Sequence, residues 1–310
     1  MIYIITQHEQ DLKNKHGEED AAMGHNFLLW LAGNVLAFEY GYRYIYTPII
    51  PEYMWTECNQ FLGFDKIVPS KLNSQGRKHW FLDDIKNYEI IDIPKIPFPA
   101  RYYQFDKIIK KYSYASISED KNIILRLAKG QGIGIDWAYF LNNDLREKYD
   151  EARRQNPVHE YKNDSFINIA CHIRRGDINP KDQSDRWITN EQYIKLFKNI
   201  YDILGSTCLI HVHSLGEKSD FSDIENLGEY IKLHLNERPI VAFHNLVSSD
   251  ILINSKSAFS VFAAYLHKGI KFCIPFSIYW TNFPDWPELI PVHKDYNFDF
   301  NKLIETMEIN

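Results

Sequence analysis

The sequence has few cysteines, and their spacing argues against two classes of small, cross-linked domain. Only four occur among 310 residues, and none forms a Cys-x-x-Cys pair with another: Cys58, Cys171, Cys208 and Cys273. Such isolated cysteines do not suit a zinc ribbon and provide no disulfide framework. We therefore expect a protein of a reducing compartment, with a cytoplasmic location.

A surplus of basic charge and a long apolar run are also missing. Basic residues number 35 and acidic residues 41, whereas proteins that bind a nucleic-acid backbone carry a basic surplus. No stretch approaches the roughly 18 uninterrupted apolar residues of a membrane span. The apolar opening, Met1–Ile5, is too short for a signal peptide. We expect neither a nucleic-acid partner nor a transmembrane segment.

Hydrophobic patterns predict alternating strands and helices in both halves of the chain. In the first half, strands are expected at 2–5 and 44–46 and helices at 27–40 and 138–154, whereas the pattern from 73 to 114 is too weak to assign. In the second half, the pattern predicts strands at 166–171, 208–213, 231–234, 251–253 and 270–274, and helices at 190–204 and 258–266. Strands that alternate with helices indicate parallel sheets, so the predicted fold class is α/β.

The polar segment from 155 to 164 is the best candidate for a linker between two domains. We predict an N-terminal domain over 1–160, a C-terminal domain over 161–290 and a helical tail over 291–310. Parallel sheets bind ligands at the carboxyl ends of their strands. Loops that directly follow strands are therefore the places where a site is expected.

One such loop begins with the run from His172 to Asp177, which reads His-Ile-Arg-Arg-Gly-Asp. Arg174 and Arg175 follow an apolar strand, Gly176 frees the backbone, and the aspartate can orient a guanidinium. Because a guanidinium donates two hydrogen bonds to phosphate oxygens at once, the run suits a diphosphate. A surface Arg–Asp pair at a strand end is the simpler alternative.

Two further segments contain candidate binding residues at helix starts. Ser255 and Ser257 lie between the strand at 251–253 and the helix that begins at Ala258, where backbone N–H groups and the helix dipole favour an anion. These serines could equally serve only as helix caps. Gly24, His25 and Asn26 open the first long helix, where small and polar residues allow a ligand to approach closely.

Taken in order, these three segments resemble the motifs of fucosyltransferases of the α-1,2, α-1,6 and protein O-linked types. The first is similar to the Gly-x-Gly-Asn-Gln helix start of bacterial α-1,2 enzymes, and the second to the His-x-Arg-Arg-x-Asp signature that all three types share. The third resembles a motif that in the bacterial enzymes reads Ser-Asn-Ser-x-Phe-Ser followed by two tryptophans and two alanines. This chain differs at several positions, with Ala22 for the first glycine, His25-Asn26 for Asn-Gln, Lys256 for asparagine and Val261-Phe262 for the tryptophans.

The resemblance implies a GT-B fold, in which two Rossmann-like domains face each other across a cleft, and an inverting transfer from GDP-fucose to a glycan hydroxyl without a metal or other cofactor. In such a fold the domain over 1–160 is on the acceptor side, the domain over 161–290 binds the nucleotide sugar, and the tail over 291–310 packs back on the first domain. It implies that Arg174 holds the donor β-phosphate with support from Arg175 and His172, and that Asp250 bonds the nucleotide base. It also implies that the third motif lines the phosphate pocket with Ser255, Ser257 and Ala258. The donor site is completed in this interpretation by Asp177, His213, Gly24, His25 and Asn26.

The residue that takes the acceptor proton is not evident from the sequence. Asp182 and Asp185 follow the arginine motif, about where related α-1,6 enzymes keep a glutamate, and Asp185 is preferred; His25, His213 and His244 are alternatives. The only acidic pair considered for a metal, Asp83-Asp84, is interpreted as a solvated turn. The alternatives for the whole chain are the same scaffold with another UDP- or GDP-linked sugar, and a binding protein without catalytic activity.

Overall fold

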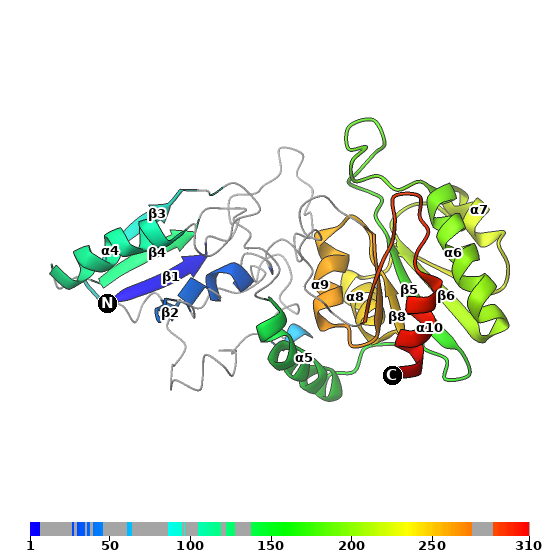
Figure 1. Cartoon of the computed structure of the whole chain (residues 1–310), viewed down its shortest axis with the longest axis horizontal. Coiled ribbons are helices and arrows are strands. Elements are labelled where there is room, and N and C mark those ends of the chain that lie inside the picture. Colours follow the sequence, from blue (N-terminus) through cyan, green and yellow to red (C-terminus); the bar gives the residue numbers. More distant parts are fainter. Residues whose placement is uncertain are drawn as a thin grey trace. The chain divides into compact units, whose positions relative to one another are not determined.

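A computed structural model shows that the chain forms two compact units, Met1–Asn156 and Pro157–Asn310 (Figure 1). The structure describes residues 1–6, 27, 30–34, 36–37, 40–45, 61–63, 86–94, 96, 105–118, 122–127, 138–274 and 288–309. Gly24, His25, Asn26 and the Asp83-Asp84 pair lie outside these residues.

The N-terminal unit contains a four-stranded sheet in the order β2-β1-β4-β3, in which every described pairing is parallel. Its elements are β1 (Ile2–Thr6), β2 (Arg43–Tyr44), β3 (Tyr88–Ile93), α4 (Asp106–Ser118), β4 (Asn122–Leu127) and α5 (Ala138–Gln155). Alternate apolar residues of β1 and β4, including Ile4 and Leu125, pack with Phe105 and Ile109 at the start of α4. This packing forms the described core of the unit.

The C-terminal unit contains six strands and a larger set of helices. Its elements are β5 (Ile167–Ile173), α6 (Asn190–Leu204), η4 (Gly205–Thr207), β6 (Cys208–Ser214), η5 (Lys218–Phe221), α7 (Ser222–Glu225), β7 (Ile231–Leu235), α8 (Pro239–Ser248), β8 (Ile251–Ile253), α9 (Ala258–Leu266), β9 (Ile270–Cys273), β10 (Leu289–Pro291) and α10 (Phe300–Ile309). α6 begins with a capping box, in which Thr189 and Gln192 bond each other's backbone N–H groups.

The strand order in the C-terminal sheet is β10-β9-β8-β5-β6-β7, and all of these pairings are parallel. The chain moves outward from β5 to β6 and β7, then returns to the other side of β5 to form β8. The order therefore reverses between β5 and β8, which is the kind of position where α/β sheets bind nucleotides. In Figure 1, α8 and α9 lie on one side of this sheet and α6 and α7 on the other.

The α/β fold class and its parallel sheets are confirmed. The strands and helices predicted after residue 160 are present with small differences in length, because their apolar periods are clear. β3 and the start of α4 fall in the weak pattern from 73 to 114, and β4 and α8 were not predicted. Leu303 of α10 is buried in the core of the C-terminal unit. No helix among the described residues is both long and apolar enough to cross a membrane.

Candidate functional site

Two of the three predicted motifs meet at the carboxyl ends of β5 and β8. His172 lies near the end of β5, and Ser255 directly follows β8. The Nδ1 atom of His172 and the Oγ atom of Ser255 share a hydrogen bond of 2.7 Å. These residues are 83 positions apart in the chain, and they come together because β5 and β8 are neighbours in the sheet. The site is thus centred on the point where the strand order reverses.

Arg174 is held at this point by the aspartate of its own motif. Its guanidinium forms a two-pronged ion pair with Asp177, in which Nε lies 3.1 Å from Oδ1 and the second contact joins Nη2 to Oδ2. Between them, Gly176 has a φ of +87°, a left-handed backbone conformation that glycine adopts without strain. The side chain of Arg174 is 18% exposed, so the turn presents an oriented cation at the strand end.

Arg175 makes a different set of contacts. Its guanidinium donates hydrogen bonds to the carbonyl of Ile188 at 3.0 Å and to Oδ1 of Asn190 at 2.8 Å, and it lies 3.9 Å from the ring centroid of Trp187. These partners occupy it from within the loop that connects β5 to α6. The structure therefore gives Arg175 a role in positioning this loop, and a direct contact with a donor phosphate stays a prediction.

The turn from β8 to α9 provides hydroxyl groups and the start of a helix. Ser257 is the N-cap of α9, and its Oγ accepts a hydrogen bond from the N–H of Phe259 at 3.3 Å. Ser255 donates its backbone N–H to Oγ of Ser260 at 3.0 Å. Capping and anion binding at the start of α9, which begins at Ala258, are compatible, because a cap leaves further N–H groups of the first turn without intrahelical partners.

His172 contributes a neutral ring to this site. Burial lowers its pKa to about 3, and the positive charge of Arg174 adds to the effect. The imidazole is therefore uncharged at neutral pH and acts through its hydrogen bond to Ser255. Charge for an anionic ligand has to come from other side chains.

Asp250 is not brought together with these residues. It precedes β8 at the amino end of the sheet, where its carboxylate accepts hydrogen bonds from the Asn168 N–H at 2.9 Å and from Lys162 at 2.7 Å. Arg174 lies six positions after Asn168, which corresponds to about 20 Å along a strand. Burial acts to raise the pKa of Asp250, but Lys162 and Asn168 outweigh it and keep the pKa low.

A half-buried carboxylate that was not singled out from the sequence, Glu237, lies at the carboxyl ends of β6 and β7. Its Oε2 lies 2.9 Å from Nδ1 of His213, and Oε1 accepts a hydrogen bond from the hydroxyl of Tyr161. Burial acts to raise the pKa of Glu237, but these two partners hold it below its usual value. His213 pairs with His172 in the strand register. Glu237 closely follows the strand predicted at 231–234, and this position is a signal that could have identified it from the sequence.

The remaining candidate bases differ in their surroundings. Asp182 accepts a hydrogen bond from Asn179 at 2.8 Å within the exposed loop after Arg174. Asp185 is exposed in the same loop, and its negative charge acts on Lys256 in the β8–α9 turn. His244 lies in α8, where its Nε2 is 2.9 Å from a carboxylate oxygen of Glu160. Among these side chains, Asp185 is the one whose charge reaches the β8–α9 turn.

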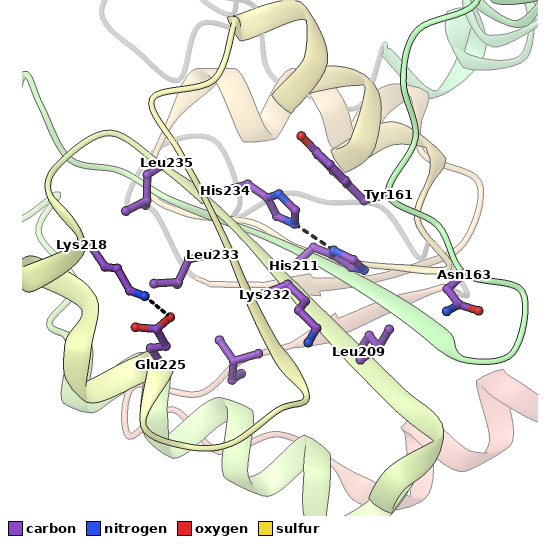
Figure 2. Close-up of a pocket in the computed structure, with 11 residues that line it drawn as sticks. Tyr161, Asn163, Leu209, His211, Lys218, Glu225, Lys232, Leu233, His234 and Leu235 are labelled. Carbon is purple, nitrogen blue, oxygen red and sulfur yellow. Dashed lines mark hydrogen bonds and ion pairs between the residues drawn. The ribbon is translucent and has the colours of Figure 1, made fainter.

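A cavity of about 660 Å³ lies beside the outer strand, β7. Figure 2 shows Tyr161, His211 and His234 at one part of this cavity, and the Lys218–Glu225 ion pair at another. The Tyr161 and His234 rings stack with centroids 3.8 Å apart, and Nδ1 of His211 lies 3.0 Å from Nε2 of His234. None of the described residues predicted for the donor site lines this cavity.

Within the described ranges, no three His, Cys, Asp or Glu side chains are grouped so that they could hold a metal ion. The described cysteines, Cys171, Cys208 and Cys273, are buried and free.

No known protein-family model matches the chain, and no curated protein sequence matches it. Among solved structures, it is similar to POFUT1 in complex with GDP, with 10% identity, a TM-score of 0.48 and coverage of 86% of this chain and 95% of that one. POFUT1 in complex with GDP-fucose gives 10% identity, a TM-score of 0.42 and coverage of 86% and 94%. The E. coli heptosyltransferase WaaC with ADP gives 10% identity, a TM-score of 0.37 and coverage of 100% and 99%. Likeness at this level carries no information on a donor or an acceptor.

Proposed function

We propose that this protein is a glycosyltransferase of the GT-B type that binds a nucleotide sugar at the carboxyl ends of β5 and β8. One observation carries the proposal: the arginine motif and the serine-rich turn meet where the strand order reverses, joined by the 2.7 Å hydrogen bond between His172 and Ser255. Nucleotides bind parallel sheets at such positions. An oriented guanidinium and the N-terminus of α9 are suited to a diphosphate.

The proposed reaction is an inverting transfer. An oxygen of the acceptor hydroxyl attacks the anomeric carbon of the donor sugar, the bond from that carbon to the diphosphate oxygen breaks, and the hydroxyl proton passes to a carboxylate. Arg174 and the start of α9 stabilise the negative charge that develops on the leaving diphosphate, and an oriented donor of this kind contributes a few kcal/mol. In this proposal no metal is needed, and Asp185 receives the proton.

GDP-fucose is the proposed donor, and a glycan hydroxyl is the proposed acceptor. The choice of fucose rests on the resemblance of the three sequence motifs. The carboxylate proposed to recognise the base is Glu237, because it lies at the carboxyl ends of the strands, whereas Asp250 lies at their amino ends.

A panel of GDP-, UDP- and ADP-linked sugars tests the proposal. The protein is incubated with each donor, and release of the nucleoside diphosphate is measured with and without glycan acceptors. We expect GDP-fucose to be consumed. Consumption of a different donor would reassign the sugar, binding without consumption would favour a non-catalytic binding protein, and failure to bind any of these donors would overturn the proposal.

A further inference from the structure

Lys256 departs from the motif that its surroundings resemble, and the structure places it within the candidate site. It lies between Ser255, which bonds His172, and Ser257, which caps α9. Both serines are buried, and Lys256 is half-buried. The β8–α9 turn therefore positions the backbone of Lys256 near the carboxyl end of β8, one residue after Ser255, whose hydrogen bond joins the two motifs.

The ammonium group of Lys256 has no hydrogen-bond or ion-pair partner among the residues that the structure describes. The two arginines of the site differ in this respect. Arg174 is paired with Asp177, and Arg175 is occupied by Ile188 and Asn190. Burial lowers the pKa of Lys256, and the negative charge of Asp185 opposes this shift. An anion that bound beside Lys256 would compensate a charge that is now half-buried and unpaired.

The charges at the site leave room for a second cation. Arg174 carries one positive charge, but Asp177 already offsets it, and His172 is neutral. A nucleoside diphosphate carries between about two and three negative charges at neutral pH, because the second pKa of a terminal phosphate is near 6. Arg174 alone does not balance such a ligand.

We propose that Lys256 is a second cation for the donor diphosphate, acting from the β8–α9 turn while Arg174 acts from the end of β5. This inference rests on the proposed function. The two cations come from the loops that follow β5 and β8, the strands that flank the reversal of strand order, and the hydrogen bond between His172 and Ser255 joins these two segments. With a lysine in place of the motif's asparagine, this chain binds the diphosphate by charge where that motif offers an amide.

Calorimetric titration of the full chain with GDP tests the proposal. We expect Lys256→Gln and Lys256→Asn each to weaken GDP binding about tenfold, the loss of one charge-assisted contact. Lys256→Arg should keep affinity within about threefold, because it keeps the charge. Lys198→Gln is the matched control, since Lys198 is an exposed lysine of α6 and its replacement changes the net charge equally. It should bind GDP as the unmodified protein does.

GMP separates ligand binding from a structural role. It lacks the β-phosphate, so the neutral Lys256 variants should lose less affinity for GMP than for GDP. An equal loss for both ligands would show a general disturbance of the turn and would overturn the proposal, as would unchanged GDP binding in both neutral variants. If Arg174→Ala loses GDP binding while those variants do not, the inference fails and the proposed function stands. If the unmodified protein binds neither GDP, UDP nor ADP, both fail.

Discussion

The amino and carboxyl ends of the strands in the C-terminal sheet carry similar polar residues in different surroundings. At the amino ends, Asp250 is bonded to Asn168 and Lys162, so its carboxylate is satisfied by the protein itself. At the carboxyl ends, Arg174 is oriented by one carboxylate and Lys256 has no partner among the described residues. From this difference we expect Asp250 to act in stability and the carboxyl ends of the strands, where Lys256 lies, to act in ligand binding.

The largest expected effect on ligand binding is at the carboxyl ends of the strands. Arg174→Ala removes an oriented guanidinium from the proposed diphosphate site, so nucleoside diphosphate affinity and donor turnover should fall about 10- to 100-fold. Thermal unfolding should change little, because the ion pair with Asp177 is partly exposed and contributes at most about 1 kcal/mol. Titration calorimetry and differential scanning calorimetry measure the two quantities. Unchanged affinity in this variant would remove the distinction between the two ends of the strands.

At the amino ends of the strands we expect a loss of stability without a loss of nucleotide affinity. Asp250→Ala leaves the N–H of buried Asn168 without its acceptor, which should destabilise the protein by about 1–3 kcal/mol. Nucleotide affinity should not change. Asp250→Asn retains an oxygen acceptor and is the matched control, with a smaller loss measured by urea unfolding. A loss of nucleotide affinity in Asp250→Asn at normal stability would return the base-binding role to Asp250.

The smallest expected effect is on the pH dependence of binding. Because the pKa of His172 is lowered to about 3, the ring stays neutral from pH 5 to 8 and contributes no charge that is lost as the pH rises. The slope of GDP affinity against pH should therefore be the same in the unmodified protein and in His172→Asn, even if the variant binds more weakly. A fall of affinity near pH 6.5 that disappears in the variant would show that the ring is a cation in the site.

Local sequence patterns predicted most of the C-terminal unit because its elements are strongly periodic. The capping residues Thr189 and Ser257 were also identifiable, since a cap depends on a few neighbouring residues. The pattern was too weak to assign from 73 to 114, where β3, with its largely exposed residues, shows little periodic burial. Strand pairing with β4 stabilises β3, and this contact is not visible in either segment alone.

The sequence alone determined the kind of protein expected: an α/β chain with arginines and serines in loops that follow strands. Only the tertiary structure decided which loops meet, because the position of β8 beside β5 depends on the order in which the strands pack. That order joined His172 to Ser255 and separated Asp250 from them. It also directed Arg175 into its own loop, since side-chain partners depend on distances in space and not on position along the chain.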